Sequence, residues 1–387
     1  MTTTSALPTS GEVDLVVVGG GATGCATAYY ASRAGARVLL LERWDLNTEA
    51  SGRNAGSLHG QLQHEPFRER GATWARNWLP ALQFLQSSLR LWDGLSAELG
   101  VDLEVAKRGG ILVADSPDQL PDIERKVVME NDAGVASRMI DREELRALAP
   151  WVSERAIGGE LCPIEGKANP LITGPAFARR AMAAGADIRT GVTVSGLEPD
   201  GNGYVVTTDR GRFRAPAVVV AAGDAMPALG RMLGLPMPVT SEPIQVCATE
   251  PVQPMVKHLV YYAGGRLTFK QAASGTLLIG GGWPARAAPD GSWVLDPESL
   301  RQNLRVAISG APAIADVAVI RTWVGIGNAT PDLMPIIDAV PGLPGVFVGI
   351  YPHMGFTASP MMGRTLARLV AGDDPELDLA PFRVDRF

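Results

Sequence analysis

The chain has 387 residues, which is long for a single domain and suits two interleaved ones. Hydrophobic residues make up 46%, beside 44 glycines and 29 prolines, so a large core and many tight turns are expected. A net charge of -6 offers no basic surface for nucleic acid, and no apolar run is long enough to span a bilayer. Residues 1–12 read as a polar tail rather than a secretory signal, so we expect a cytoplasmic protein whose membrane association is at most peripheral.

The first predicted unit is a βαβ segment with a glycine-rich turn. A strand over residues 15–18 precedes a helix, and a second strand over 38–41 ends on Glu42. The turn between the first strand and the helix has the pattern G-x-G-x-x-G, at Gly19, Gly21 and Gly24. These glycines permit a tight turn, a close approach of backbone to pyrophosphate, and close helix–strand packing, while an acid such as Glu42 binds ribose. The segment therefore predicts a dinucleotide site.

The middle of the chain predicts helices and a return to the first sheet. A helix is expected over 68–92 with core aromatic residues, a strand over 110–113, a charged helix around 123–128, and a helix capped by Asp141. Two alternating strands around an Asn-Gly turn, then an apolar strand ending at Gly223, predict a β-meander that rejoins the parallel sheet. This return favours FAD over a nicotinamide cofactor, because the chain comes back to cover the cofactor.

The last third predicts a second sheet and a second cofactor-facing helix. Strands at 267–270 and 277–280 indicate a mostly antiparallel sheet between about 236 and 293. A buried strand over 346–350 leads through a glycine turn into a helix expected from Ser359. The amides near Gly355, Phe356 and Thr357 would stabilise negative charge on a reduced flavin.

The chain resembles the D-amino-acid oxidase family of FAD-dependent oxidases and dehydrogenases over nearly its whole length. The resemblance is carried by the N-terminal βαβ, residues 50–56, the strand at Val194, residues 221–223, and 323–387. Residues 269–271, 280–285 and 355–360 are similar to one branch, the β subunits of opine and D-hydroxyproline dehydrogenases.

This resemblance implies an α/β fold in which a doubly wound, Rossmann-like FAD domain is interleaved with an α+β substrate domain on a mostly antiparallel sheet. The expected FAD domain covers 13–60, 166–235 and 321–387, and the expected substrate domain covers 61–165 and 236–320. The implied FAD contacts are Gly19, Gly21, Ala22, Thr23, Gly24, Glu42, Arg43, Ser51, Arg53, Asn54, Ala55, Gly56, Ser57, Val194, Ala222, Gly223, Gly355, Phe356 and Thr357. His59 is a lining or packed histidine, or alternatively a covalent attachment point.

The chain departs from the family pattern at the substrate anchor. Family amino-acid oxidases hold the substrate carboxylate with an arginine two residues beyond the glycine of a Trp-x-Gly motif, and here that position is Gly327. Lys270, Arg266 and Arg108 are candidate substitutes, and Lys270 is the one to test. Where sarcosine oxidases carry an oxygen-activating lysine, this chain has Leu278, which favours a dehydrogenase over an oxidase.

The candidate catalytic side chains are Lys270, Tyr262 and His353. Tyr261 and Tyr262 precede the strand of Lys270 and would cover the substrate, although core packing fits them equally well. The scattered cysteines, Cys25, Cys162 and Cys247, argue against a disulfide framework, a metal site or an iron–sulfur cluster in this chain.

The expected activity is oxidation of a C–N bond of a secondary amine or amino acid, such as an opine or D-hydroxyproline, by hydride transfer to flavin N5. A dehydrogenase needs a further electron carrier, so a partner subunit with another redox centre is expected. The alternatives are a self-sufficient glycine, sarcosine or D-amino-acid oxidase that makes hydrogen peroxide, and a non-catalytic FAD-holding subunit.

Overall fold

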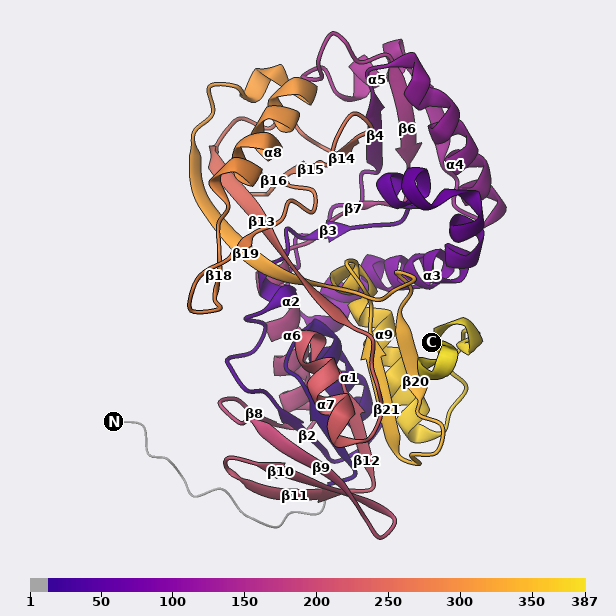
Figure 1. Ribbon diagram of the computed structural model, residues 1–387, viewed down its shortest axis with the longest axis vertical. Coiled ribbons are helices and arrows are strands. Elements are labelled where there is room, and N and C mark those ends of the chain that lie inside the picture. Colours follow the sequence, from indigo (N-terminus) through magenta and orange to yellow (C-terminus); the bar gives the residue numbers. More distant parts are fainter. Residues whose placement is uncertain (1–12) are drawn as a thin grey trace.

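The computed structural model describes residues 13–387, so the predicted polar tail lies outside the described residues. A six-stranded sheet forms one half of the molecule (Figure 1). Its order is β20-β21-β12-β1-β2-β8, parallel except for the β20–β21 pair. The strands are β1 (Leu15–Val18), β2 (Val38–Leu41), β8 (Asp187–Arg189), β12 (Ala217–Val220), β20 (Ile336–Ala339) and β21 (Val346–Ile350).

Alternating side chains of this sheet enter two separate cores. Val17 and Leu40 pack toward the helices α1 (Ala22–Arg33), α6 (Pro170–Ala183) and α9 (Gly355–Ala371). Val16 and Leu41 pack toward the opposite layer. That layer is the antiparallel meander β9 (Val194–Asp200), β10 (Gly203–Thr208) and β11 (Gly211–Ala215), with α7 (Met226–Met232) beside it. Because both faces are covered, the strands are continuously apolar, and the predicted β-meander and parallel return are confirmed.

An eight-stranded sheet forms the other half (Figure 1), in the order β19-β13-β16-β15-β14-β4-β6-β5. Its strands are β4 (Gly110–Ala114), β5 (Arg138–Asp141), β6 (Gly158–Cys162), β13 (Thr240–Pro251), β14 (Leu259–Tyr262), β15 (Thr268–Gln271), β16 (Thr276–Gly280) and β19 (Val319–Ala329). All its pairs are antiparallel except β14–β4, as expected for a mostly antiparallel sheet. Short strand pairs β3 (Ser57–Leu58) with β7 (Gly166–Lys167), and β17 (Arg286–Ala287) with β18 (Trp293–Val294), complete the strands.

The helix predicted over 68–92 is longer in the structure. It is α3 (His64–Leu99), with a non-helical Gly71 that kinks it. Its buried Trp78 and Trp92 belong to the core of the six-stranded sheet, so α3 joins the two halves, and the boundaries of the two domains stay a prediction. The remaining helices are α2 (Ala50–Arg53), α4 (Leu120–Asp132), α5 (Arg142–Leu148) and α8 (Pro297–Gly310).

The predicted N-cap of α5 is present in the structure. The Asp141 carboxylate accepts a 2.9 Å hydrogen bond from the Glu144 amide and caps α5 as predicted. The three cysteines are buried free thiols. Within residues 13–387, none of the helices combines the length and the apolar character needed to cross a membrane.

Candidate functional site

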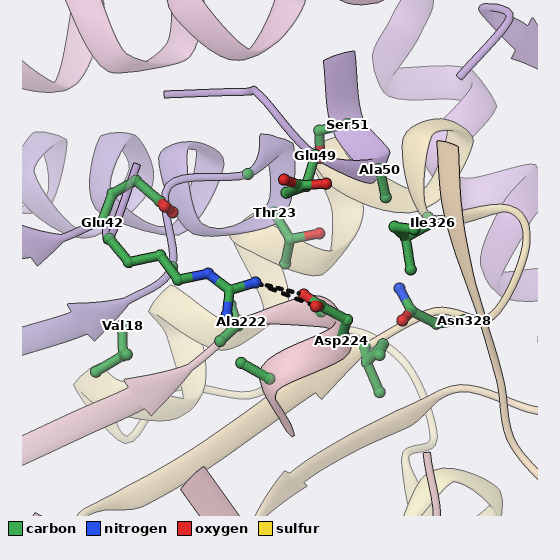
Figure 2. A pocket seen from close by; sticks show the side chains of 18 of the residues that line it. Val18, Thr23, Glu42, Glu49, Ala50, Ser51, Ala222, Asp224, Ile326 and Asn328 are labelled. Atoms are coloured by element: carbon green, nitrogen blue, oxygen red, sulfur yellow. Dashed lines mark hydrogen bonds and ion pairs between the residues drawn. The ribbon is translucent and has the colours of Figure 1, made fainter. Parts of the chain in front are cut away.

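A cavity of about 290 Å³ lies where the two halves meet, at the carboxyl ends of β1, β2 and β12 (Figure 2). This is where open parallel sheets bind nucleotides. Twelve of the predicted cofactor residues line it: Gly19, Gly21, Thr23, Glu42, Arg43, Ser51, Asn54, Val194, Ala222, Gly223, Gly355 and Phe356.

The glycine turn has no room for a Cβ atom at two of its positions. A Cβ on Gly24 would lie 1.9 Å from the Gly19 carbonyl oxygen, and a Cβ on Gly19 would lie 2.5 Å from that of Ala221. Gly19 also has a φ of +113°, which other residues rarely adopt. The turn therefore brings β1, α1 and β12 into contact and opens the N-terminus of α1 to the cavity.

The acid of the motif is held in place by backbone amides. Glu42 accepts hydrogen bonds from Gly20 N at 2.6 Å and from Trp44 N at 2.7 Å. The next residue, Arg43, donates to both carboxylate oxygens of Asp224, at 3.0 and 3.1 Å. This ion pair links the ends of β2 and β12 beside the cavity, and the dashed lines that end on Asp224 mark it in Figure 2.

A second helix N-terminus, that of α9, reaches the same cavity. The helix begins at Gly355, four residues before the predicted Ser359, because the chain turns at His353, which has a φ of 54°. The N-cap residues, Gly21 of α1 and Met354 of α9, provide no side-chain cap. Apart from Ala22 N, which donates to the Ser51 hydroxyl, first-turn amides of both helices therefore remain available. Two positive helix ends therefore face one cavity, an arrangement that favours an anionic ligand.

The loop after β2 connects the cavity to the second sheet. The Ser51 hydroxyl accepts a 2.9 Å hydrogen bond from Ala22 N at the start of α1. The Asn54 side chain accepts a 2.8 Å bond from Gly56 N and thereby closes the turn. Thr357 donates from its hydroxyl to Ser57 O at 3.2 Å, which joins this loop to α9.

Seven predicted cofactor residues do not line the cavity itself: Ala22, Gly24, Arg53, Ala55, Gly56, Ser57 and Thr357. They shape the turn and the loop, and Arg53 is exposed, with its guanidinium donating to Thr48 O. Lining residues that the sequence did not single out include Asn47, Asp224, Ile326 and Asn328. Asp224 follows the predicted cofactor residue Gly223 directly, so its place in the sequence could have identified it as a lining residue.

Lys270 lies on the face of the second sheet that looks toward this loop. Its ammonium donates a 2.7 Å hydrogen bond to the Ser57 hydroxyl, and the side chain is 1% exposed. Burial, with a smaller contribution from Lys167, lowers the pKa of Lys270 to about 7. Lys270 lies directly opposite Leu278 on β16, so a cation stands beside the position where the family's lysine is missing from the sequence.

Tyr262 is not in this site. It packs in the core cluster on the other face of the sheet, and its hydroxyl donates to Asp115. Successive residues of a strand point to opposite faces, so Tyr261, not Tyr262, shares the face of Lys270. Of the other proposed anchors, Arg266 is an exposed partner of Glu65, and Arg108 is exposed.

His353 lines the cavity, as predicted for a site residue, and pairs with an acid. Its Nε2 lies 3.4 Å from Glu242 Oε2, and burial lowers its pKa while Glu242 opposes that shift. Glu242 is the strand partner of Gly327. The position that holds an arginine in family oxidases is therefore bordered by an acid, so a carboxylate is disfavoured there.

Known proteins match this chain over nearly its whole length. The chain is 27% identical over 384 residues to the beta chain of sarcosine oxidase from Arthrobacter sp, a match that covers 97% of this chain and 91% of that protein. It is 28% identical over 386 residues to a component of opine oxidase from Rhizobium meliloti, covering 97% and 98%. The solved structure of glycine oxidase from Geobacillus kaustophilus superposes with a TM-score of 0.85 at 25% identity, covering 98% and 100%.

The family model described as DAO, FAD dependent oxidoreductase, matches residues 14–369. The cofactor is therefore FAD, and the enzyme is of the amine and amino-acid oxidase type. The chain belongs to the DAO family of FAD-dependent oxidoreductases.

Proposed function

We propose that the protein is a dehydrogenase that oxidises a C–N bond of a secondary amine or amino acid, such as an opine or D-hydroxyproline, to an imine. FAD, when bound, supplies the hydride acceptor. The residues of this chain bind the substrate, orient its α-carbon and exclude water. Water then hydrolyses an open-chain imine, whereas a cyclic substrate leaves as its cyclic imine.

The cavity fits FAD. The amides of α1 would hold the pyrophosphate, Glu42 the ribose, and the amides of α9 the electron-rich edge of the flavin. The buried Oδ1 of Asn328, which lines the cavity, has no hydrogen-bond partner among residues 13–387. Such an atom favours a ligand that donates a hydrogen bond to it.

The observation that carries the proposed substrate class, an amine that bears a carboxylate, is the position of Lys270. Two buried side chains carry a cationic group in the described part of the chain, Lys126 and Lys270. Lys126 is paired with Glu130 and Glu160, whereas the ammonium of Lys270 has only the Ser57 hydroxyl as a partner within residues 13–387. A substrate carboxylate would form an ion pair with this cation, so we assign Lys270 as the carboxylate anchor in place of the missing arginine.

Both the sarcosine oxidase relative and the opine oxidase relative are named as subunits of their enzymes. These names support a secondary amine as substrate and a partner subunit for this chain. We propose that the partner carries the redox centre that accepts electrons from the reduced flavin.

A self-sufficient oxidase is the second candidate, and Lys270 favours it. This chain has leucine, not lysine, at position 278, but Lys270 lies directly opposite it on the neighbouring strand and brings a cation to the same place. A cation there would stabilise superoxide developing beside the flavin. The argument from Leu278 therefore does not by itself distinguish the two activities.

Anaerobic mixing of the purified flavoprotein with amines tests both. The panel contains octopine, nopaline, D- and L-hydroxyproline, proline, sarcosine, glycine and D-alanine. Bleaching of the flavin band by a secondary amine, with slow recovery in air, supports the dehydrogenase. Fast recovery with peroxide identifies an oxidase, and no bleaching by any amine contradicts the proposal and favours a non-catalytic, FAD-holding subunit.

The anchor is tested in the same assay with Lys270→Met. We expect the amine concentration for half-maximal reduction to rise by about 10- to 100-fold, because a charge-assisted hydrogen bond contributes about 1.5–3 kcal/mol. Lys257→Met removes an exposed lysine of the same sheet region and serves as the control. Equal effects of the two substitutions would remove Lys270 from the anchor role.

A further inference from the structure

A chain of three hydrogen-bonded side chains leads from the loop after β3 into the eight-stranded sheet. His59 Nδ1 lies 2.7 Å from the Tyr261 hydroxyl, and that hydroxyl lies 3.0 Å from Glu165 Oε1. His59 is in the loop after β3, Tyr261 is on β14, and Glu165 precedes β7. The mechanism proposed above assigns no role to any of them.

Glu165 is fully buried, and all its partners are donors. Gly60 N and Gln61 N donate to Oε1 at 2.6 and 3.2 Å, and the Gln61 side-chain amide donates to Oε2 at 2.6 Å. Lys126 donates to Gln61 Oε1 at 2.8 Å, so it fixes which end of that amide faces Glu165. Three of the four bonds to the Glu165 side chain come from N–H groups, which can only donate, and the hydroxyl of Tyr261 supplies the fourth. This environment favours the carboxylate form of Glu165, because a carboxylate accepts hydrogen bonds and has no proton to donate.

This pattern sets the direction of the chain. Tyr261 has one hydroxyl proton and donates it to Glu165, so its oxygen must accept from His59, whose Nδ1 carries the proton. The His59 Nε2 then bears the lone pair. Among residues 13–387 this nitrogen has no hydrogen-bond partner. The side chain is half-buried, and Nε2 is not fully enclosed by protein atoms. A free proton acceptor therefore lies near Lys270 and His353, whose charges act on His59.

We propose that His59, Tyr261 and Glu165 form a proton relay that deprotonates the ammonium group of the bound substrate. The proton moves from the substrate nitrogen to His59 Nε2, the Nδ1 proton moves to the Tyr261 oxygen, and the hydroxyl proton moves to Glu165. The neutral amine keeps its electron pair, which then drives hydride loss from the α-carbon. One proton is gained by Glu165 for each one lost by the substrate, and the inference rests on the proposed function.

The electrostatics of the chain favour this direction. Burial raises the pKa of Glu165 to about 7, although its hydrogen bonds and Lys126 oppose the shift. Burial, together with Lys270 and His353, lowers the pKa of His59 to about 3. A proton therefore does not rest on His59 but passes to Glu165, whose affinity suits neutral pH. The other titratable groups facing Tyr261 are Cys162 and Glu160, and both raise its pKa.

The first test is the pH dependence of anaerobic flavin reduction by a secondary amine that the panel identifies. At pH 7 we expect Glu165→Gln and Tyr261→Phe to slow reduction by about 100-fold, within the range of general-base effects. Above the pKa of the free amine the substrate arrives neutral, so both variants should regain wild-type rates. Tyr262→Phe removes a similar hydroxyl–carboxylate contact on the other face of the sheet and should keep the wild-type profile.

A deficit of equal size at every pH would mean that Glu165 and Tyr261 only support the structure, and no deficit would remove them from the reaction. Either result overturns the relay. A second test needs no substrate: infrared titration of the flavoprotein should show a carboxylic-acid band with a midpoint near 7 that Glu165→Gln removes. If no amine reduces the flavin, the proposed function fails, and absence of this band would separately exclude Glu165 as the acceptor.

Discussion

The ammonium group of Lys270 donates a 2.7 Å hydrogen bond to the hydroxyl of Ser57. The bond joins the eight-stranded sheet to the segment that follows β2 of the six-stranded sheet. It is also the only hydrogen bond of this ammonium among residues 13–387, so a buried cation stands at the junction of the two halves without a carboxylate. Both the stability that this buried cation costs and its proposed role in binding substrate can be measured.

The first prediction concerns stability and pH. The pKa of Lys270 is about 7 in the fold and 10.5 in the unfolded chain, so only the unfolded state holds the proton between these values. Stability therefore rises with pH across that window, and the whole penalty is present below pH 7. The free energy of unfolding of Lys270→Met should exceed that of wild type by roughly 2–3 kcal/mol more at about pH 6 than at about pH 9. Urea unfolding at the two pH values measures this difference, and parallel curves would contradict it.

The second prediction concerns the glycine turn. Gly24→Ala would place a methyl group 1.9 Å from the Gly19 carbonyl oxygen, so α1 must move away from β1. We expect purified protein with at least about 10-fold less bound flavin and a clearly lower melting temperature. Gly94→Ala, in α3, meets no atom within 4 Å and should stabilise the helix by about 0.5–1 kcal/mol. Normal flavin content in Gly24→Ala would refute this account of the turn.

The third prediction concerns the Arg43–Asp224 pair. Both side chains are about one-third exposed, so we expect their contribution to folding stability to be below about 1 kcal/mol. Because the pair links β2 and β12 beside the cavity, Arg43→Ala and Asp224→Ala should each speed FAD release several-fold. The double variant should be no faster than either single one. Flavin fluorescence after dilution measures the rates, and additive effects would show that the two residues act separately.

The fourth prediction concerns Lys126, which contacts Glu130 and Glu160 at 2.7 Å each with all three side chains fully buried. Lys126→Met leaves two buried acidic side chains without their cation and should cost about 3–5 kcal/mol at neutral pH. Arg214→Met removes a cation from an exposed pair with Asp200 and should leave the unfolding midpoint unchanged. Similar midpoints for the two variants would show that burial does not control the energy of these pairs.

Much of the cofactor side of this protein was determined by the sequence alone. The Gly19–Gly24 turn, the acid Glu42 and the return to Gly223 are local patterns, because strand period, glycine freedom and helix start depend on neighbouring residues. The structure puts all these segments at one cavity. The start of α9 was predicted four residues late, since a positive φ at His353 cannot be inferred from its residue type.

The substrate side was decided by tertiary structure. Sequence periodicity marks a strand but not which of two adjacent tyrosines shares the face of Lys270. Both were therefore candidates to cover the substrate, and Tyr262 was chosen as catalytic although Tyr261 is the one on that face. Lys270 and Ser57 are 213 positions apart, and His59, Tyr261 and Glu165 come from three separate segments. Their contacts depend on sheet register and on the packing of the two halves, which are set by long-range burial and not by local sequence.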